Sequence, residues 1–221
     1  MKAGKRWLPL VLALAGGWAC SVNSSYLMLR LEALSVPVLK TEDFREMAVT
    51  DFYVPEPALD LNLNQEVTDY FRAELGPRFK GSVSRRSLVP DKEETFKDEA
   101  FWKEAAGGAT GVLFLTGKIR LDQELRKALL NEDIGSRENP FLQKKVWNER
   151  KNFTLQTTLF LIDGGTGRVV FQKDYKEEAN YANIKQPSAF ALFDLLQQLK
   201  VKFFRTVFGS VRIQERYLLF R

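Results

Sequence analysis

The 221-residue sequence contains no histidine and a single cysteine, Cys20. The absence of histidine excludes Ser-His-Asp and Cys-His catalytic systems, and it removes the commonest transition-metal ligand. A lone cysteine can form neither a disulfide within the chain nor a thiolate zinc site. We therefore expect no metal, no cofactor and no catalytic centre built on these residue types, although chemistry carried by carboxylates stays open.

A strong net charge is also missing once the chain is divided. The formal charge is +5, but three basic residues (Lys2, Lys5 and Arg6) lie among the first 19 residues, which contain no acid, so the rest carries +2. Such a balance lacks the clustered positive charge that is typical of nucleic-acid binding. We therefore expect no nucleic-acid partner.

The first 19 residues have the order of a secretory signal peptide: a basic start, an apolar run over 7–15, and small residues up to Ala19. This segment resembles the bacterial lipoprotein signal, which implies cleavage before Cys20 and attachment of acyl chains to it. Buried methylenes of such chains hold a protein on a bilayer. Gly17 and Trp18 replace the leucine and the small residue of the usual signal, so an ordinary signal peptide cut nearby, or an uncleaved anchor, is the alternative.

The remaining chain is expected to form a tether over residues 20–44 and one domain over residues 45–221. Serine follows Cys20 where aspartate would favour inner-membrane retention, so we expect the outer membrane, on the side facing the periplasm. A chain of this length can bury a core without disulfides. Its 17 phenylalanines indicate that aromatic packing supplies much of that core.

Apolar periodicity predicts an α/β fold in which a mixed β-sheet packs with about three helices. The predicted strands are 46–54, 79–89, 111–121, 153–162 and 168–175, with a glycine-rich hairpin turn at 163–167. The predicted helices are 65–75, 91–106 and one from 188 to Gly209, with Asn64 as the cap of the first. The tail over 213–220 is predicted to add an edge strand or a partner-docking segment.

Residues 122–151 carry dense and balanced charge, which indicates a long charged insertion or loop. Phe141 and Trp147 are large aromatic residues in this polar stretch, and Lys144 and Lys145 form a basic pair between them. Because tryptophan is enriched at binding hot spots, we name these four residues as candidate partner-binding residues. The alternative is a solvated insertion whose aromatic residues only pack under the loop.

Four segments match a known pattern: 47–54 as a first strand, 68–79 as a first helix, 111–119 as an apolar strand running into Thr-Gly, and 159–163 with 166–170 as a hairpin. In this order the chain resembles the periplasmic lipoproteins that include the penicillin-binding-protein activator lipoproteins and the curli-secretion lipoprotein. The amino-terminal domain of the Tol translocation protein is similar. The resemblance spans roughly residues 45–208 and implies this fold and an envelope location.

Together these features favour a non-catalytic envelope lipoprotein that binds a partner protein and positions or activates it in envelope assembly. One alternative is an envelope enzyme that acts on glycan or lipid through carboxylates. Another is a subunit of a secretion or lipid-transport complex. The sequence names neither the partner nor the oligomeric state.

Overall fold

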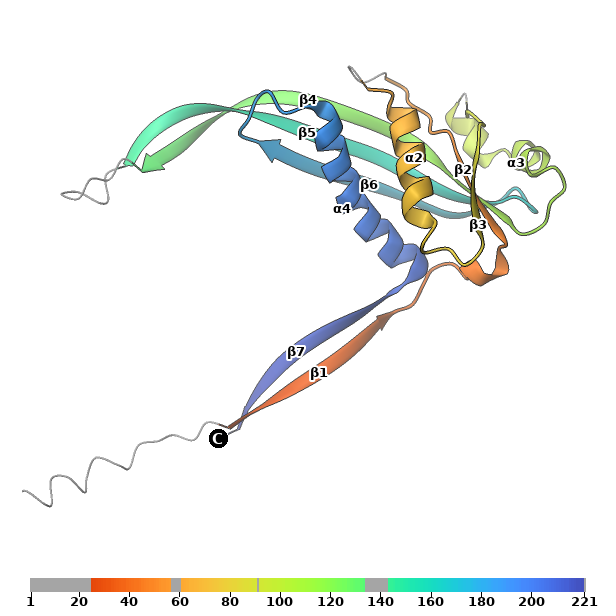
Figure 1. Ribbon diagram of the computed structural model, residues 1–221, viewed down its shortest axis with the longest axis horizontal. Helices are drawn as coiled ribbons and strands as arrows, with labels where there is room; N and C mark the ends of the chain where they lie inside the picture. Colours follow the sequence, from red (N-terminus) through yellow and green to blue (C-terminus); the bar gives the residue numbers. More distant parts are fainter. Residues whose placement is uncertain (1–24, 57–60, 91, 134–142, 221) are drawn as a thin grey trace, which may run out of the picture. The chain divides into compact units, whose positions relative to one another are not determined.

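A computed structural model describes residues 25–56, 61–90, 92–133 and 143–220. The chain divides into two units. In one, β1 (Ser25–Ser35) pairs with β7 (Ser210–Phe220) in a two-stranded sheet, and in the other, residues 35–210 form the main domain (Figure 1). No helix within these described ranges combines the length and the apolar character that crossing a bilayer requires.

The main domain is a five-stranded mixed sheet with three helices, which confirms the predicted fold class. Its elements are β2 (Glu46–Thr50), α2 (Leu63–Leu75), β3 (Ser82–Arg86), α3 (Glu99–Ala106), β4 (Val112–Asp133), β5 (Gln143–Asp163), β6 (Val169–Tyr181) and α4 (Ser188–Phe208). Two short 3-10 turns, Thr41–Asp43 and Glu93–Lys97, precede β2 and α3.

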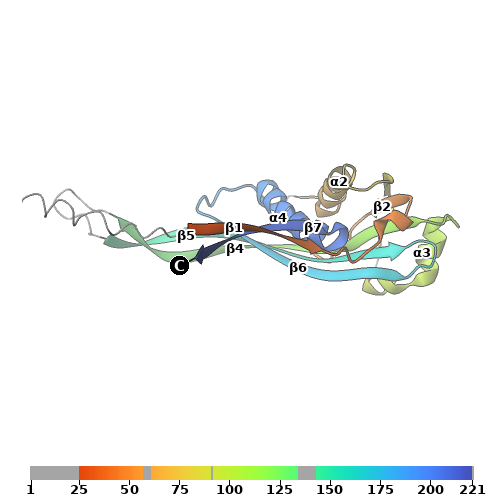
Figure 2. The same cartoon turned by 90° about the horizontal axis from the view of Figure 1, so that it is seen from below.

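The strand order across the sheet is β3-β2-β4-β5-β6, with β2 parallel to both of its neighbours and β4, β5 and β6 antiparallel. The chain moves outward from β2 to β3 and then back past β2 to β4. Since parallel crossovers are right-handed, these opposite moves place α2 and α3 on opposite faces of the sheet. We call the face under α2 and α4 the helix face, and the other the open face (Figure 2).

Aromatic side chains fill the core on both faces, as their number in the sequence predicts. On the helix face, the rings of Phe71 from α2 and Phe203 from α4 meet edge to face with centroids 5.8 Å apart. On the open face, the Trp102 ring lies 5.2 Å from that of Phe114, and its indole N–H donates to the Thr95 carbonyl at 2.9 Å. Such aromatic pairs contribute about 0.5–1.5 kcal/mol each beyond the area they bury.

The start of α2 differs from the prediction by two residues. Asn62 is the cap, since its side-chain oxygen accepts from the Gln65 amide at 3.3 Å. Asn64 instead lies inside the helix and accepts from the amide of Phe52 at 2.8 Å, which ties the helix to the segment that follows β2. Strand β2 itself ends at Thr50, before the predicted boundary at 54.

The helix predicted over 91–106 is two elements. The Asp98 carboxylate accepts from the amides of Ala100 and Phe101, at 3.0 and 3.2 Å, and so caps a new helix, α3. The preceding 3-10 turn, Glu93–Lys97, places Phe96 in a stack on Phe160 with centroids 4.6 Å apart. The predicted strand over 79–89 is also shorter and covers Ser82–Arg86.

The expectation of a loop over 122–151 is wrong for the part of this segment that the structure describes. Residues 122–133 continue β4 and residues 143–151 belong to β5, paired from Asp122↔Thr154 to Asp133↔Gln143. Cross-strand pairing explains the balanced charge: Lys127 and Glu149, for example, form an ion pair at 3.6 Å. The tail predicted as a strand does form one, β7, but it pairs with β1 and not with the main sheet.

Candidate functional site

Strands β4 and β5 continue as a two-stranded ribbon beyond the end of β6. The last residue of β6, Tyr181, pairs with Lys151 of β5, and Lys151 in turn pairs with Leu125 of β4. We call residues 125–133 and 143–151 the arm; it extends past the third strand of this part of the sheet in Figure 1. A lone two-stranded ribbon is only marginally stable in water, so anything that covers the arm also stabilises it.

One face of the arm carries large apolar side chains in contact with solvent. Leu125 is 60% exposed, Leu129 47% and Trp147 70%. Leu129 lies directly opposite Trp147, and the two-residue period of a strand puts Leu125 on the same face. The Lys127–Glu149 ion pair lies between these apolar positions. The face therefore presents a leucine and a leucine–tryptophan pair on either side of an ion pair.

On the other face of the arm, the side chains that the structure describes are polar. Asn148, next to Trp147, is exposed and points to this side, as does Arg126. The guanidinium of Arg126 donates to the Glu124 carboxylate at 2.8 Å, and this hydrogen bond raises the pKa of Arg126. Among the side chains of the arm that the structure describes, the large apolar ones therefore lie on one face.

The structure describes three of the four predicted partner-binding residues. Trp147 lies on the apolar face of the arm and is among its most exposed side chains. Lys144 and Lys145 occupy positions of β5 within the arm. Phe141 and the predicted lipidation residue, Cys20, lie outside the described residues. A role in partner binding stays a prediction for all four candidates.

Two residues of the apolar face, Leu125 and Leu129, were not among the predicted site residues. The sequence contains a signal for them, because both stand an even number of positions apart and would share one face of a strand. The even spacing is informative only if the segment is assigned as a strand. If the segment is assigned as a loop, no periodicity relates Leu125 and Leu129 to Trp147.

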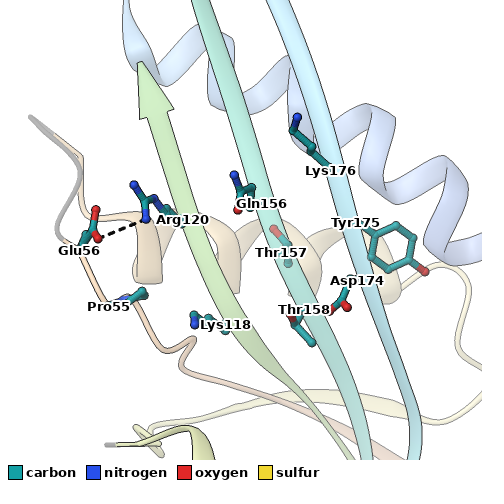
Figure 3. Close-up of a pocket in the computed structure, with 10 residues that line it drawn as sticks. All are labelled: Pro55, Glu56, Lys118, Arg120, Gln156, Thr157, Thr158, Asp174, Tyr175 and Lys176. Atoms are coloured by element: carbon teal, nitrogen blue, oxygen red, sulfur yellow. Dashed lines mark hydrogen bonds and ion pairs between the residues drawn. The ribbon is translucent and has the colours of Figure 1, made fainter. Parts of the chain in front are cut away.

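A second feature is a polar hollow of about 630 Å³ in the main domain (Figure 3). Side chains from β4, β5 and β6 form its floor, and the segment after β2 borders it. The lining residues are Pro55, Glu56, Lys118, Arg120, Gln156, Thr157, Thr158, Asp174, Tyr175 and Lys176. Most of them belong to the open face, beyond the part of that face that α3 covers.

The hollow holds charges of both signs, and its most prominent cation is already paired. Arg120 contacts Glu56 at 3.2 Å and Asp122 at 2.8 Å, and the hydrogen bond to Asp122, with the charges of both acids, raises the pKa of Arg120. The dashed line in Figure 3 marks the contact with Glu56. Such a balanced site does not select for ligands of one charge.

Four further polar residues of the hollow have partners, whereas the buried hydroxyl of Thr157 has no hydrogen-bond partner among the described residues. Lys176 donates to Glu178 at 2.7 Å, and this bond lowers the pKa of Glu178. Thr158 donates to the Asp174 carboxylate at 2.7 Å, and Lys118 pairs with Glu93. In the part of the chain that the structure describes, no group of three histidine, cysteine, aspartate or glutamate side chains is arranged to hold a metal ion.

No protein-family model matches the chain, and no curated protein matches it in sequence. The PelC dodecamer from Paraburkholderia phytofirmans is 11% identical, with 79% of this chain and 95% of PelC covered and a TM-score of 0.42. Lipoprotein GNA1162 from Neisseria meningitidis is 12% identical, with 71% and 98% covered and a TM-score of 0.38. The LpoB C-terminal domain from Salmonella enterica is 10% identical, with 60% and 82% covered and a TM-score of 0.27.

These likenesses agree with the predicted resemblance at a coarse level only. The chain is distantly similar in structure to small bacterial envelope lipoproteins. A likeness this remote does not identify a function. The residues of the chain itself must therefore support any proposal.

Proposed function

We propose that this chain is a non-catalytic, lipid-anchored protein of the bacterial envelope that binds a partner protein through the apolar face of its arm. The observation that carries the proposal is the exposure of Leu125, Leu129 and Trp147 on one face of a ribbon. Clustered exposed apolar side chains mark interaction sites in soluble domains. Tryptophan is also among the residues that dominate binding energy when a partner covers them.

The geometry of the arm suits a partner with an apolar groove. A fully buried large apolar side chain gains roughly 1.5–3 kcal/mol relative to an exposed one, so covering Trp147 and Leu129 together contributes several kcal/mol. The Lys127–Glu149 pair lies between Leu125 and the Leu129–Trp147 pair, so a partner that covers all three apolar side chains must also contact this ion pair, and such polar contacts orient a partner more than they add affinity. The main sheet holds the root of the arm in place, which lowers the ordering cost of binding.

Affinity purification of the full-length chain from membranes, followed by mass spectrometry, tests this proposal. Trp147→Ala and Leu129→Ala are expected to lose the partner that the unaltered chain retains. Asn148→Ala is the matched control, since Asn148 is exposed on the same strand but faces the other way. Recovery of the same partner by all three variants would overturn the role of the apolar face.

The lipid anchor at Cys20 is a separate part of the proposal and has its own test. We expect mass spectrometry of the amino-terminal peptide to find Cys20 acylated after cleavage. Cys20→Ser is expected to move the protein from the membrane fraction to the soluble fraction, because two or more acyl chains are what make such attachment stable. A free Cys20 thiol in the membrane-bound protein would contradict acylation.

The enzyme alternative can be tested at the hollow, where the acids Glu56 and Asp174 lie. Glu56 is paired with Arg120, and Asp174 accepts from Thr158. We propose that neither acid turns over a substrate. Purified protein incubated with peptidoglycan and lipid fragments should release no product, whereas turnover that Asp174→Asn abolishes would establish the enzyme instead.

A further inference from the structure

Strand β6 forms one edge of the main sheet and is 13 residues long, whereas β3, at the other edge, has five residues. Within the described residues, β6 pairs with β5 alone. Proteins usually protect such an edge with proline, a bulge or a covering segment, because unpaired backbone groups recruit another strand. β6 contains no proline, and the irregularity in its pairing with β5, at Val170, lies near its start, so residues 171–181 pair regularly. Because charged side chains also protect an edge, only a further strand with complementary charges is expected to pair with this part of β6.

We propose that β6 pairs antiparallel with β6 of a second copy of this chain, around a two-fold axis at Tyr175. This pairing places Asp174 of each copy opposite Lys176 of the other, on the open face. On the helix face it places Lys173 of each copy opposite Glu177 of the other. Opposite charges directly across two strands stabilise their pairing, and like charges destabilise it.

The charges favour this register over the two neighbouring two-fold registers. A two-fold axis between antiparallel edges keeps corresponding faces on the same side only when a residue lies on the axis. With Asp174 on the axis, the two Asp174 carboxylates would face each other. With Lys176 on the axis, two ammonium groups would meet and Asp174 would lie opposite Glu178. Only the axis at Tyr175, among these neighbours, turns every direct charge contact into an attraction.

An unsatisfied carboxylate oxygen supports the same pairing. Glu177 is only 4% exposed, and one of its oxygens accepts from Lys202 at 2.7 Å. The other oxygen is buried and has no hydrogen-bond partner among the described residues. Leaving a buried acceptor without a donor is unfavourable. Lys173 of the second copy, directly opposite Glu177, would bring an ammonium group to this carboxylate.

Space for that contact exists beside Glu177. A crevice of about 340 Å³ lies between β6 and α4, and Lys173, Lys202 and Arg205 are among its lining residues. Because these cations outnumber the acids there, the helix face of the pair remains positive. The open face, with Asp174 and Lys176, is charge-balanced and therefore gives the cleaner test.

Charge reversal on the open face tests the proposal in the full-length chain, purified in detergent, with the molar mass followed by analytical ultracentrifugation. Asp174→Lys and Lys176→Asp each convert two symmetric attractions into repulsions. Each should therefore weaken the dimer about tenfold or more, given typical cross-strand pair energies. The double variant Asp174→Lys with Lys176→Asp restores opposite charges across the strands and should restore the dimer. Lys185→Asp, an exposed change outside β6, is the matched control and should leave the dimer intact.

Circular dichroism of each variant checks that the exposed substitutions leave the fold unchanged. A wild-type chain that stays monomeric at its highest soluble concentration would overturn the proposal. So would a double variant that stays dissociated while folded, or an assembly whose mass none of the reversals changes. A dimer that each single reversal breaks and the double reversal restores would establish the β6 edge as the interface.

Discussion

Strands β4 and β5 each pass through two environments, the base of the sheet and the arm. In the base, Leu113, Leu115 and Ile119 of β4 are completely buried between helices and neighbouring strands. In the arm, Leu125 and Leu129 of the same strand are about half exposed or more. The base uses its leucines to hold the fold together, whereas the arm keeps apolar side chains that the fold does not use. This contrast is why we assign partner binding to the arm.

The largest effect is expected at the base. Leu115→Ala should lower the free energy of unfolding by about 2–5 kcal/mol, because it removes buried methyl groups and leaves a cavity. Denaturant unfolding monitored by circular dichroism measures this loss. A loss below about 1 kcal/mol, the centre of the range for ordinary substitutions, would break the distinction between the base and the arm.

A smaller effect is expected from alkaline pH, and it belongs to the base alone. Burial raises the pKa of Tyr175 to about 12, above its ordinary value of 10.0. The folded state therefore holds this proton more tightly than the unfolded state, so the stability is complete below pH 10 and falls as the pH rises toward 12. The free energy of unfolding, measured by denaturant titration at several pH values in this range, should fall less steeply with pH for Tyr175→Phe than for wild type. Equal slopes for the two proteins would contradict the prediction.

The smallest effect on stability is expected in the arm. Leu125→Ala should change the free energy of unfolding by no more than about 0.5 kcal/mol, as surface substitutions usually do. It is the matched partner of Leu115→Ala, since both remove the same groups from β4. A destabilisation as large as that of Leu115→Ala would show that the arm is part of the folded core.

Much of the base could be predicted from the sequence because its signals are local. Asp163 organises the predicted hairpin turn, accepting from Gly165 at 2.9 Å and from the Thr166 hydroxyl at 2.8 Å. Gly209 ends α4 with a φ of 73°, a conformation that favours glycine. The apolar run at the start of β4 predicted a strand buried on both faces, and it is one.

The arm could not be predicted in the same way because its stability depends on pairing across the ribbon. Lys127 and Glu149 are 22 positions apart in the sequence, so their ion pair leaves no local pattern. Charges that alternate in sign along one strand look like a solvated loop until the opposite strand is known. The edge position of β6 is likewise a property of the sheet order and not of any short segment.

The most direct test of the central claim is site-specific photo-crosslinking of the full-length chain in the cells that make it. A photoreactive residue at the position of Trp147 should capture one protein of defined mass, whereas the same residue at the position of Asn148, on the opposite face of the arm, should not. Capture at both positions, or at neither, would contradict partner binding through the apolar face of the arm.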